Sequence, residues 1–179
     1  MNLSKSSMFL NYFKDYFLKK KLKNYVSNVA DVTSDNKVQT VGILVDETAF
    51  FQTLALKEAL VNADFLEKNI AILAFKADVK NNQVSNYPVF SWEHINWSFQ
   101  IQEASVLDFI QNPFDVLVSY YDTNNSFLQW ITYQSKASFK VGFFSVDKRL
   151  NHILINTVTQ NYKQFVQEFV RILHLFNKI

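Results

Sequence analysis

Four blocks of consecutive apolar residues, mostly β-branched or aromatic, constrain the fold of this chain more than any other feature. They read VQTVGILV at 38–45, NIAILAF at 69–75, FDVLVSYY at 114–121 and FKVGFF at 139–144. Successive side chains of a strand point to opposite faces, so a strand that is apolar at consecutive positions is buried on both faces of its sheet. Helical segments separate these blocks, which predicts βαβ units. We therefore expect a single three-layer, Rossmann-like α/β domain with a mostly parallel sheet.

The segments between the blocks have the residue spacing of amphipathic helices. The expected helices cover residues 7–26, about 48–61, 103–111, 123–135 and 159–177. We expect the acidic turn at 46–48 to cap the second helix and Asp122 or Thr123 to cap the fourth, because short polar side chains accept hydrogen bonds from the first free N–H groups of a helix. Short strands are expected at 89–92, 98–101 and 153–156.

The first helix is both aromatic and basic. Phe9, Phe13 and Phe17 recur every four residues and therefore share one face. A lysine cluster follows near the end of the helix, at Lys19, Lys20, Lys21 and Lys23. Residues 1–24 carry a charge of +5, whereas the other 155 residues sum to −3. The basic character of the chain thus belongs to its first segment.

A polar stretch separates this helix from the first strand. The sequence therefore predicts a basic aromatic helix at 1–26, a linker at 27–37 and the α/β domain at 38–179. An aromatic helix with lysines at one end can lie on a membrane surface, contact the nucleic-acid backbone or dock on a protein. The alternative is that Phe9, Phe13 and Phe17 pack on the domain while the lysines are merely solvated.

Polar side chains follow three of the predicted strands, at the edge of the sheet where α/β proteins bind ligands. The candidate ligand-binding residues there are Asp46, Glu47, Asp122, Asn124, Asp147 and Arg149. The alternative role for Asp and Asn at these positions is helix capping. If the first and third strands are neighbours, Asp46 and Asp122 could form a carboxylate pair, and acid–base chemistry would then require their environments to separate the two pKa values.

Several kinds of site have no support in the sequence. The chain has no cysteine, so thiol catalysis and Cys-ligated zinc are excluded. The turn after the first strand, DETAF, lacks the glycines of a dinucleotide-binding turn, and no P-loop motif occurs. The three histidines have no partner at metal-ligand spacing. We therefore assign no catalytic residue and expect no metal or cofactor. No signal peptide and no apolar run near the ~20 residues of a membrane helix occurs, so we expect a cytoplasmic protein.

The chain resembles an uncharacterised family of short bacterial proteins, frequent in Bacteroidota. The resemblance rests on the Lys-rich first helix and on the blocks VGILVDE at 41–47, FDVLVSYY at 114–121 and SKASFKVG at 135–142, with LN at 150–151 and INT at 155–157. It covers nearly the whole chain and implies no activity. Residues 114–144 are also similar to the acceptor-side half of heptosyltransferase-like glycosyltransferases, which implies shared architecture rather than shared activity.

These observations favour a non-catalytic binding or adaptor protein, whose basic N-terminal helix engages a protein or RNA partner. The alternative is a small-molecule-binding domain or minor enzyme that uses the polar residues at the strand ends. A third hypothesis, an oligomerisation or scaffold role, follows from the aromatic surplus if those side chains are exposed as one patch.

Overall fold

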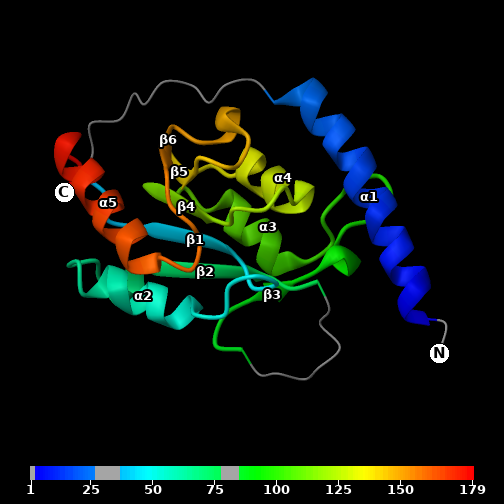
Figure 1. The fold of residues 1–179 in the computed structure, drawn as a ribbon, viewed down its shortest axis with the longest axis horizontal. Coiled ribbons are helices and arrows are strands. Elements are labelled where there is room, and N and C mark those ends of the chain that lie inside the picture. The colour runs from blue at the N-terminus through cyan, green and yellow to red at the C-terminus, as the bar shows by residue number, and fades with distance from the viewer. Residues whose placement is uncertain (1–2, 27–36, 78–84) are drawn as a thin grey trace.

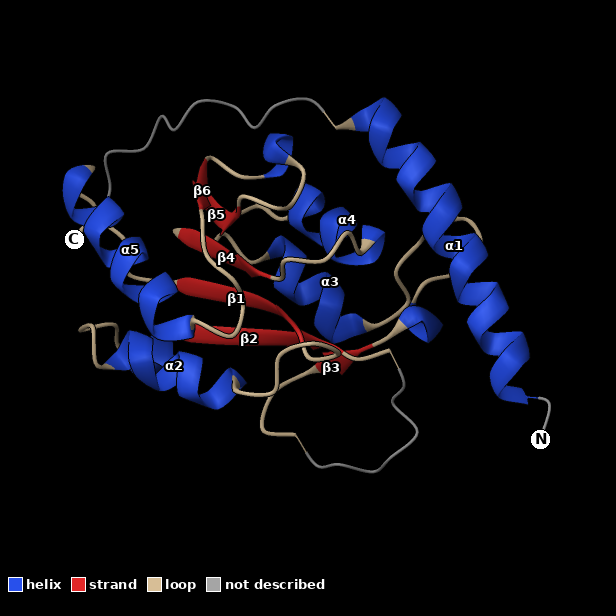
Figure 2. Ribbon diagram, viewed as in Figure 1, coloured by secondary structure: helices blue, strands red, loops and turns tan. Residues whose placement is uncertain are grey.

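The computed structural model describes residues 3–26, 37–77 and 85–179. Its centre is one sheet of parallel strands (Figures 1 and 2). The strands of the described residues are β1 (Val41–Asp46), β2 (Ile70–Phe75), β3 (Val89–Phe90), β4 (Val116–Tyr120), β5 (Phe139–Phe143) and β6 (Ile153–Ile155). They lie in the order β3-β2-β1-β4-β5-β6, and all neighbouring strands run parallel. The Rossmann-like α/β fold predicted from the apolar blocks is therefore confirmed.

Helices cover both faces of the sheet (Figure 1). One face carries α2 (Thr53–Val61) and α5 (Tyr162–Leu175), and the other carries α3 (Ala104–Gln111) and α4 (Ser126–Gln134). The connections within the described residues contain the short 3₁₀ helices η1 (Glu67–Asn69), η2 (Trp92–His94) and η3 (Lys148–Leu150). This arrangement gives the three layers that the strand pattern requires, because each inner strand is covered from both sides.

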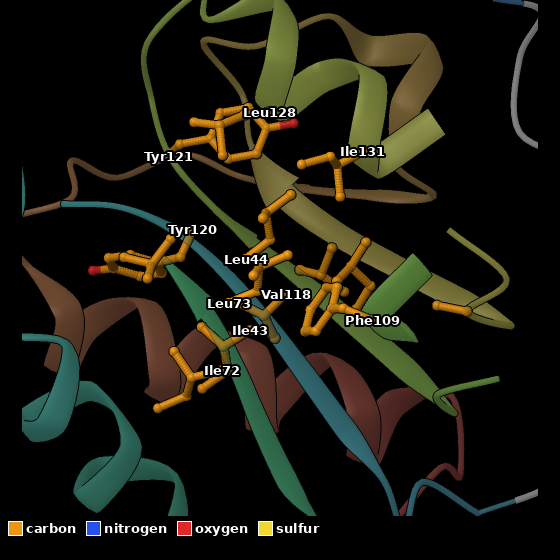
Figure 3. Close-up of a cluster of buried hydrophobic side chains, with 14 of the residues drawn as sticks. Ile43, Leu44, Ile72, Leu73, Phe109, Val118, Tyr120, Tyr121, Leu128 and Ile131 are labelled. Carbon is orange, nitrogen blue, oxygen red and sulfur yellow. The ribbon is translucent and has the colours of Figure 1, made fainter. Parts of the chain in front are cut away.

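The core fills both spaces between the sheet and the helices. Ile43 of β1 lies beside Ile72 of β2 and Val118 of β4 in the strand register, and all three are buried. The next position, Leu44, lies beside Leu73 on the opposite face. Figure 3 shows Leu128 and Ile131 of α4 on that side. Since burial of one such side chain contributes about 1.5–3 kcal/mol, the two layers together hold the fold.

Two strand positions require glycine because other side chains approach the backbone closely. A Cβ atom on Gly42 of β1 would lie 2.7 Å from Cδ2 of Phe114. A Cβ atom on Gly142 of β5 would lie 2.6 Å from Nδ2 of Asn151. Both distances are far below van der Waals contact, so these glycines allow tight packing within the sheet.

The N-terminal helix α1 (Leu3–Tyr25) packs along α4, at the end of the molecule opposite α5 (Figure 1). Its inward side chains are Leu18 and Leu22, and Val26 directly after the helix is also buried. Phe9, Phe13 and Phe17 instead point outward and are 63%, 37% and 46% exposed. The alternative in which these phenylalanines pack on the domain is therefore wrong, because the leucines occupy the interface.

Polar contacts set the position of α1 on the body. The carboxylate of Asp15 accepts a hydrogen bond from the N–H of Ser126, the first residue of α4, at 3.2 Å. The ammonium of Lys14 donates to the backbone carbonyls of Trp92 and Ile95, at 2.8 and 2.7 Å. Burial lowers the pKa of Lys14, with a smaller opposing effect from Glu93. The helix is thus held by charge-assisted hydrogen bonds as well as by apolar packing.

The expected caps of two helices are wrong. The acidic turn at 46–48 does not cap α2, which begins at Thr53 after Gln52, because the Asp46 side chain is turned toward other partners. The cap of α4 is Asn125, whose side-chain oxygen accepts from the N–H groups of Phe127 and Leu128, so neither Asp122 nor Thr123 has this role.

The region at 98–101 also differs from its prediction. The side-chain oxygen of Asn96 accepts from the N–H groups of Ser98 and Gln100, which makes a turn, and one isolated bridge between Ile95 and Ile101 replaces the expected strand. Residues 27–36, most of the predicted linker, lie outside the described residues.

Candidate functional site

All carboxyl ends of the parallel strands lie at one edge of the sheet, and the strand order reverses direction between β1 and β4. This switch point is where doubly wound α/β folds usually bind ligands. The residues predicted from the strand ends therefore meet at the expected edge, and their partners decide which of them are available to a ligand.

At the switch point, Asp46 is buried and its oxygens are already occupied. Oδ1 accepts hydrogen bonds from the backbone N–H and the hydroxyl of Thr48. Oδ2 accepts from the hydroxyl of Thr123, at 2.9 Å, and so ties the end of β1 to the link after β4. A carboxylate with both oxygens bonded inside the fold has a structural role here.

Glu47, the next residue, is also used internally. Oε1 accepts from the hydroxyls of Thr53 and Tyr87, and Oε2 lies 3.2 Å from the ammonium of Lys76. Burial and the hydrogen bond to Glu47 raise the pKa of Tyr87, so its phenol keeps the proton that it donates. This cluster joins α2 and the residues before β3 to the end of β1.

The carboxylate of Asp122 is directed to the connection between β6 and α5. Its Oδ2 accepts from the N–H and the hydroxyl of Thr159, at 3.4 and 3.2 Å. The hydroxyl of Tyr120 donates to the carbonyl of the same Thr159, at 2.6 Å. Although β1 and β4 are neighbours, Asp46 and Asp122 therefore serve separate hydrogen-bond clusters instead of forming an acid–base pair.

Aromatic rings close the remaining space at the switch point. The centroids of the Phe50 and Tyr120 rings lie 4.8 Å apart, and the ring of Phe165 also packs on Tyr120, at 5.0 Å. Burial raises the pKa of Tyr120, and the nearby Asp122 adds to the effect. The turn after β1 thus carries a buried phenylalanine, Phe50, where dinucleotide-binding folds have the small residues that let the backbone approach pyrophosphate.

A cavity of about 670 Å³ lies beside the switch point, between α1 and the links that follow β4 and β5. Its lining comes from residues more than a hundred positions apart: Tyr16, Lys19, Lys20, Leu22, Lys23, Asn124, Gln129, Ser145, Val146, Asp147, Lys148 and Arg149. Five of these described residues are cationic and one, Asp147, is a carboxylate. The described lining therefore has an excess of positive charge.

The single carboxylate of this lining is neutralised by its neighbour. The guanidinium of Arg149 makes two hydrogen bonds to Asp147, Nη2 to Oδ2 at 2.7 Å and Nε to Oδ1 at 3.0 Å. The hydrogen bond from Arg149 lowers the pKa of Asp147 below its ordinary value. Nη1 of Arg149 also donates to the carbonyl of Val26, at 2.9 Å, and so connects the end of α1 to the cavity wall.

The lysine cluster of α1 is divided between the cavity and the body. Lys19 lines the cavity and pairs with Asp15 at 2.7 Å. Lys20 and Lys23 line it as well, are exposed, and make no ion pair with any described residue. Lys21 lies on another side of the helix, where its ammonium is 4.8 Å from the ring centroid of Trp130.

The predicted residues therefore separate into two groups. The cavity brings together Asn124, Asp147 and Arg149 from the strand ends with Lys19, Lys20 and Lys23 from α1. The switch-point carboxylates Asp46, Glu47 and Asp122 and the helix residue Lys21 do not line it. Lys148 and Gln129 also line the cavity and were not among the candidate site residues. Lys148 lies in the connection after β5, next to Asp147 and Arg149, so its place in the sequence could have indicated it, whereas nothing in the sequence distinguishes Gln129 within α4.

A second cavity, of about 710 Å³, lies away from these residues, beside β2 between α2 and α3. Its charged lining is Lys57, Glu58, Glu67 and Asp108, and Lys57 pairs with Glu67 at 2.8 Å. It contains none of the predicted site residues.

In the part of the chain that the structure describes, no cluster of three or more His, Asp or Glu side chains could hold a metal ion. Among the same residues, no helix has the length and apolar character needed to cross a bilayer.

The sequence model of a family of unknown function, DUF6913, matches residues 13–176. The chain belongs to this family. The DUF6913 match begins within α1 and ends beyond α5, so it includes most of the docked helix as well as the α/β body. No curated protein matches the chain. No solved structure matches it either.

Proposed function

We propose that this DUF6913 protein is a non-catalytic binding protein for a small anion that carries phosphate groups. The observation that carries the proposal is the cavity between α1 and the strand ends, whose described lining holds five cationic side chains. Lys19 pairs with Asp15 and Arg149 pairs with Asp147, so Lys20, Lys23 and Lys148 are the lining cations that make no ion pair with a described residue. Opposite charges attract, so these cations stabilise an anion that enters the cavity. A cavity of this kind therefore gains most from a ligand with several negative charges.

The chemistry of the lining favours phosphate over a single carboxylate. Lysine ammonium groups bind phosphate as point charges that need no fixed bidentate geometry. The side-chain amides of Asn124 and Gln129 add neutral hydrogen-bonding capacity through the atoms that their mutual hydrogen bond, from Nε2 of Gln129 to Oδ1 of Asn124 at 2.8 Å, does not use. Tyr16 and Val146 give an apolar wall for an organic part of the ligand. The volume of about 670 Å³ is within the usual range for small-molecule sites.

Binding without catalysis agrees with the state of the nearby carboxylates. Asp46, Glu47 and Asp122 each accept hydrogen bonds from groups of the chain itself and lie outside the cavity lining. A general base must reach the proton that it removes, and these oxygens are committed elsewhere.

Thermal unfolding with three probes tests this proposal. Pyrophosphate and ADP should raise the melting temperature of the full chain. Adenosine has the base and the sugar of ADP but no phosphate, and it should leave the melting temperature unchanged. A ligand at a hundred times its Kd stabilises the folded state by about 2.7 kcal/mol. The triple variant K20Q/K23Q/K148Q should lose the response.

The matched control removes the same charge elsewhere, in K68Q/K136Q/K163Q, whose three lysines are exposed and outside the cavity. It should respond as the wild type does. Equal loss of the response in both triple variants would show general charge attraction instead of a site, and no response of the wild type to either anion would refute the proposal.

The adaptor role predicted from the sequence is a second candidate, because Lys20 and Lys23 are exposed and unpaired among the described residues. It differs from the first in requiring a macromolecule on α1. Titration of the protein with a labelled single-stranded RNA separates the two: an adaptor for RNA loses binding in K20Q/K23Q and keeps it in K148Q. If K148Q also loses RNA binding, the RNA binds at the cavity and not on α1 alone.

A further inference from the structure

The outward side of α1 exposes an unusual number of large apolar side chains. We call them the aromatic face of α1, and they are Met8, Phe9, Leu10, Tyr12, Phe13, Tyr16 and Phe17. Their exposed fractions range from 37% to 71%. The rings contact one another, with centroids 4.7 Å apart for Phe9 and Phe13 and 5.4 Å apart for Tyr16 and Phe17. A contiguous apolar patch on a surface marks a site of interaction.

The aromatic face is fixed outward by the docking of the helix. Leu18 and Leu22 are buried against the body on the opposite side of α1. Lys14 and Asp15 hold the helix through hydrogen bonds to backbone groups of the body. Rotation of α1 to bury its aromatic rings would break all of these contacts. The body thus presents the aromatic face to an external surface.

The charge on this side of the helix is positive only. Lys20 and Lys23 follow the aromatic face along α1 and are exposed. The one carboxylate of the helix sequence, Asp15, is turned to the body, where it contacts Lys19 and Ser126. An occupant must therefore offer apolar material beside the rings and negative charge beside the lysines.

An anionic phospholipid surface meets both requirements, and we propose that α1 lies flat on one and attaches the protein to it. Aromatic and leucine side chains enter the boundary between headgroups and acyl chains, while lysines remain at the anionic headgroups. A second copy of this face would bring further lysines and no carboxylate. Nucleic acid offers phosphates but no apolar layer for Met8 and Leu10.

An exposed tryptophan lies beside the helix. Trp97 is 55% exposed, and the ammonium of Lys14 lies 5.7 Å from its ring centroid. Tryptophan and tyrosine favour the interface between bilayer and water, since one end of each ring system is polar. Trp97 therefore also serves as the probe of the interaction, because its fluorescence shifts to the blue when the ring leaves water.

Vesicle flotation of the full chain tests the inference. The wild type should float with phosphatidylcholine vesicles that contain phosphatidylglycerol and remain unbound to phosphatidylcholine alone. F9S/F13S should weaken partitioning by at least about tenfold, through lost apolar burial. K20Q/K23Q should weaken it by about thirtyfold, because one lysine near an anionic surface contributes about fivefold.

Two controls separate this inference from the anion cavity and from general hydrophobicity. F51S/F176S removes two exposed phenylalanines from other parts of the surface and should float as the wild type does. K148Q changes the cavity without touching α1 and should also float normally. If F9S/F13S floats normally, the inference is wrong. A dimer in sedimentation velocity that F9S/F13S abolishes, with no vesicle binding, would assign the face to a second copy and also overturn it.

Discussion

Lys140 of β5 is a buried cation, and its burial has a measurable cost. The side chain points toward α4, is 7% exposed, and donates to the carbonyl oxygen of Thr132 at 2.7 Å. That carbonyl belongs to the last turn of α4, where a helix has free acceptors and where positive charge is favourable. No carboxylate of the described residues pairs with it. Burial, helped by repulsion from Lys136, lowers the pKa of Lys140 to about 8.

The size and sign of the effect follow from this pKa. The unfolded chain holds the proton up to the ordinary value of 10.5, whereas the folded chain releases it at about 8. Between these values unfolding takes up a proton, so the free energy of unfolding rises with pH, by at most about 1.4 kcal/mol per unit. The whole interval corresponds to about 3 kcal/mol. The cost is fully present below the folded pKa and disappears above the unfolded pKa.

The variant K140M isolates this cost, since methionine has a similar length and no charge. Urea unfolding followed by tryptophan fluorescence gives the free energy of unfolding of both proteins at a series of pH values from neutral to alkaline. We expect the wild type to gain about 3 kcal/mol relative to K140M over that range. At neutral pH the variant still lacks the hydrogen bond to Thr132, which offsets its advantage by about 1 kcal/mol.

The control K163M removes an exposed lysine of α5. Its free energy of unfolding should differ from that of the wild type by the same amount at every pH. The reasoning is refuted if the difference between wild type and K140M is also independent of pH. Lys140 would then titrate in the folded chain as it does in water, and the packing around it would not exclude solvent.

Three further predictions concern packing and charge. Gly142→Ala places a Cβ atom against the buried Asn151, so we expect a loss of about 1–3 kcal/mol in urea unfolding. Leu18→Ala removes a fully buried contact of α1 and should cost about 2–3 kcal/mol and speed proteolysis within α1, measured by limited trypsin digestion. Burial alone would raise the pKa of Asp115, but hydrogen bonds from the backbone near Thr40 lower it. The stabilisation by Asp115 is present above its unfolded pKa near 3.8 and is lost as pH falls, so the stability advantage of the wild type over D115N should shrink on acidification.

The sheet could be predicted because its signal is local. β1 is buried at all six positions, and only a strand between two helix layers requires apolar side chains on both faces. The same holds for α5, where Phe165, Phe169 and Leu173 recur every four residues and are buried together. The burial of each of these elements can be read from the pattern of its own residues, so the prediction does not depend on which elements pack against it.

The helix starts and the orientation of α1 could not be predicted in this way. Asp46 has the chemistry of a cap but bonds to Thr123, a residue seventy-seven positions away, and α2 begins later as a result. In α1 both the phenylalanines and the leucines follow a helical spacing. Which of the two sets of side chains faces the domain depends on the packing of α1 against α4 and on the hydrogen bonds of Lys14 and Asp15. The spacing of apolar residues along α1 does not reveal these contacts.

By itself, the sequence determined the class of fold, the edge where polar residues gather and the segment that holds the positive charge. Only the tertiary structure decided that α1 lies beside that edge, that Lys20 and Arg149 share one cavity, and that the carboxylates at the switch point are occupied by partners within the chain. The physical reason is the separation along the chain of the residues that interact. Apolar burial leaves a pattern in consecutive residues, whereas a site is made by side chains that meet only after the elements have packed.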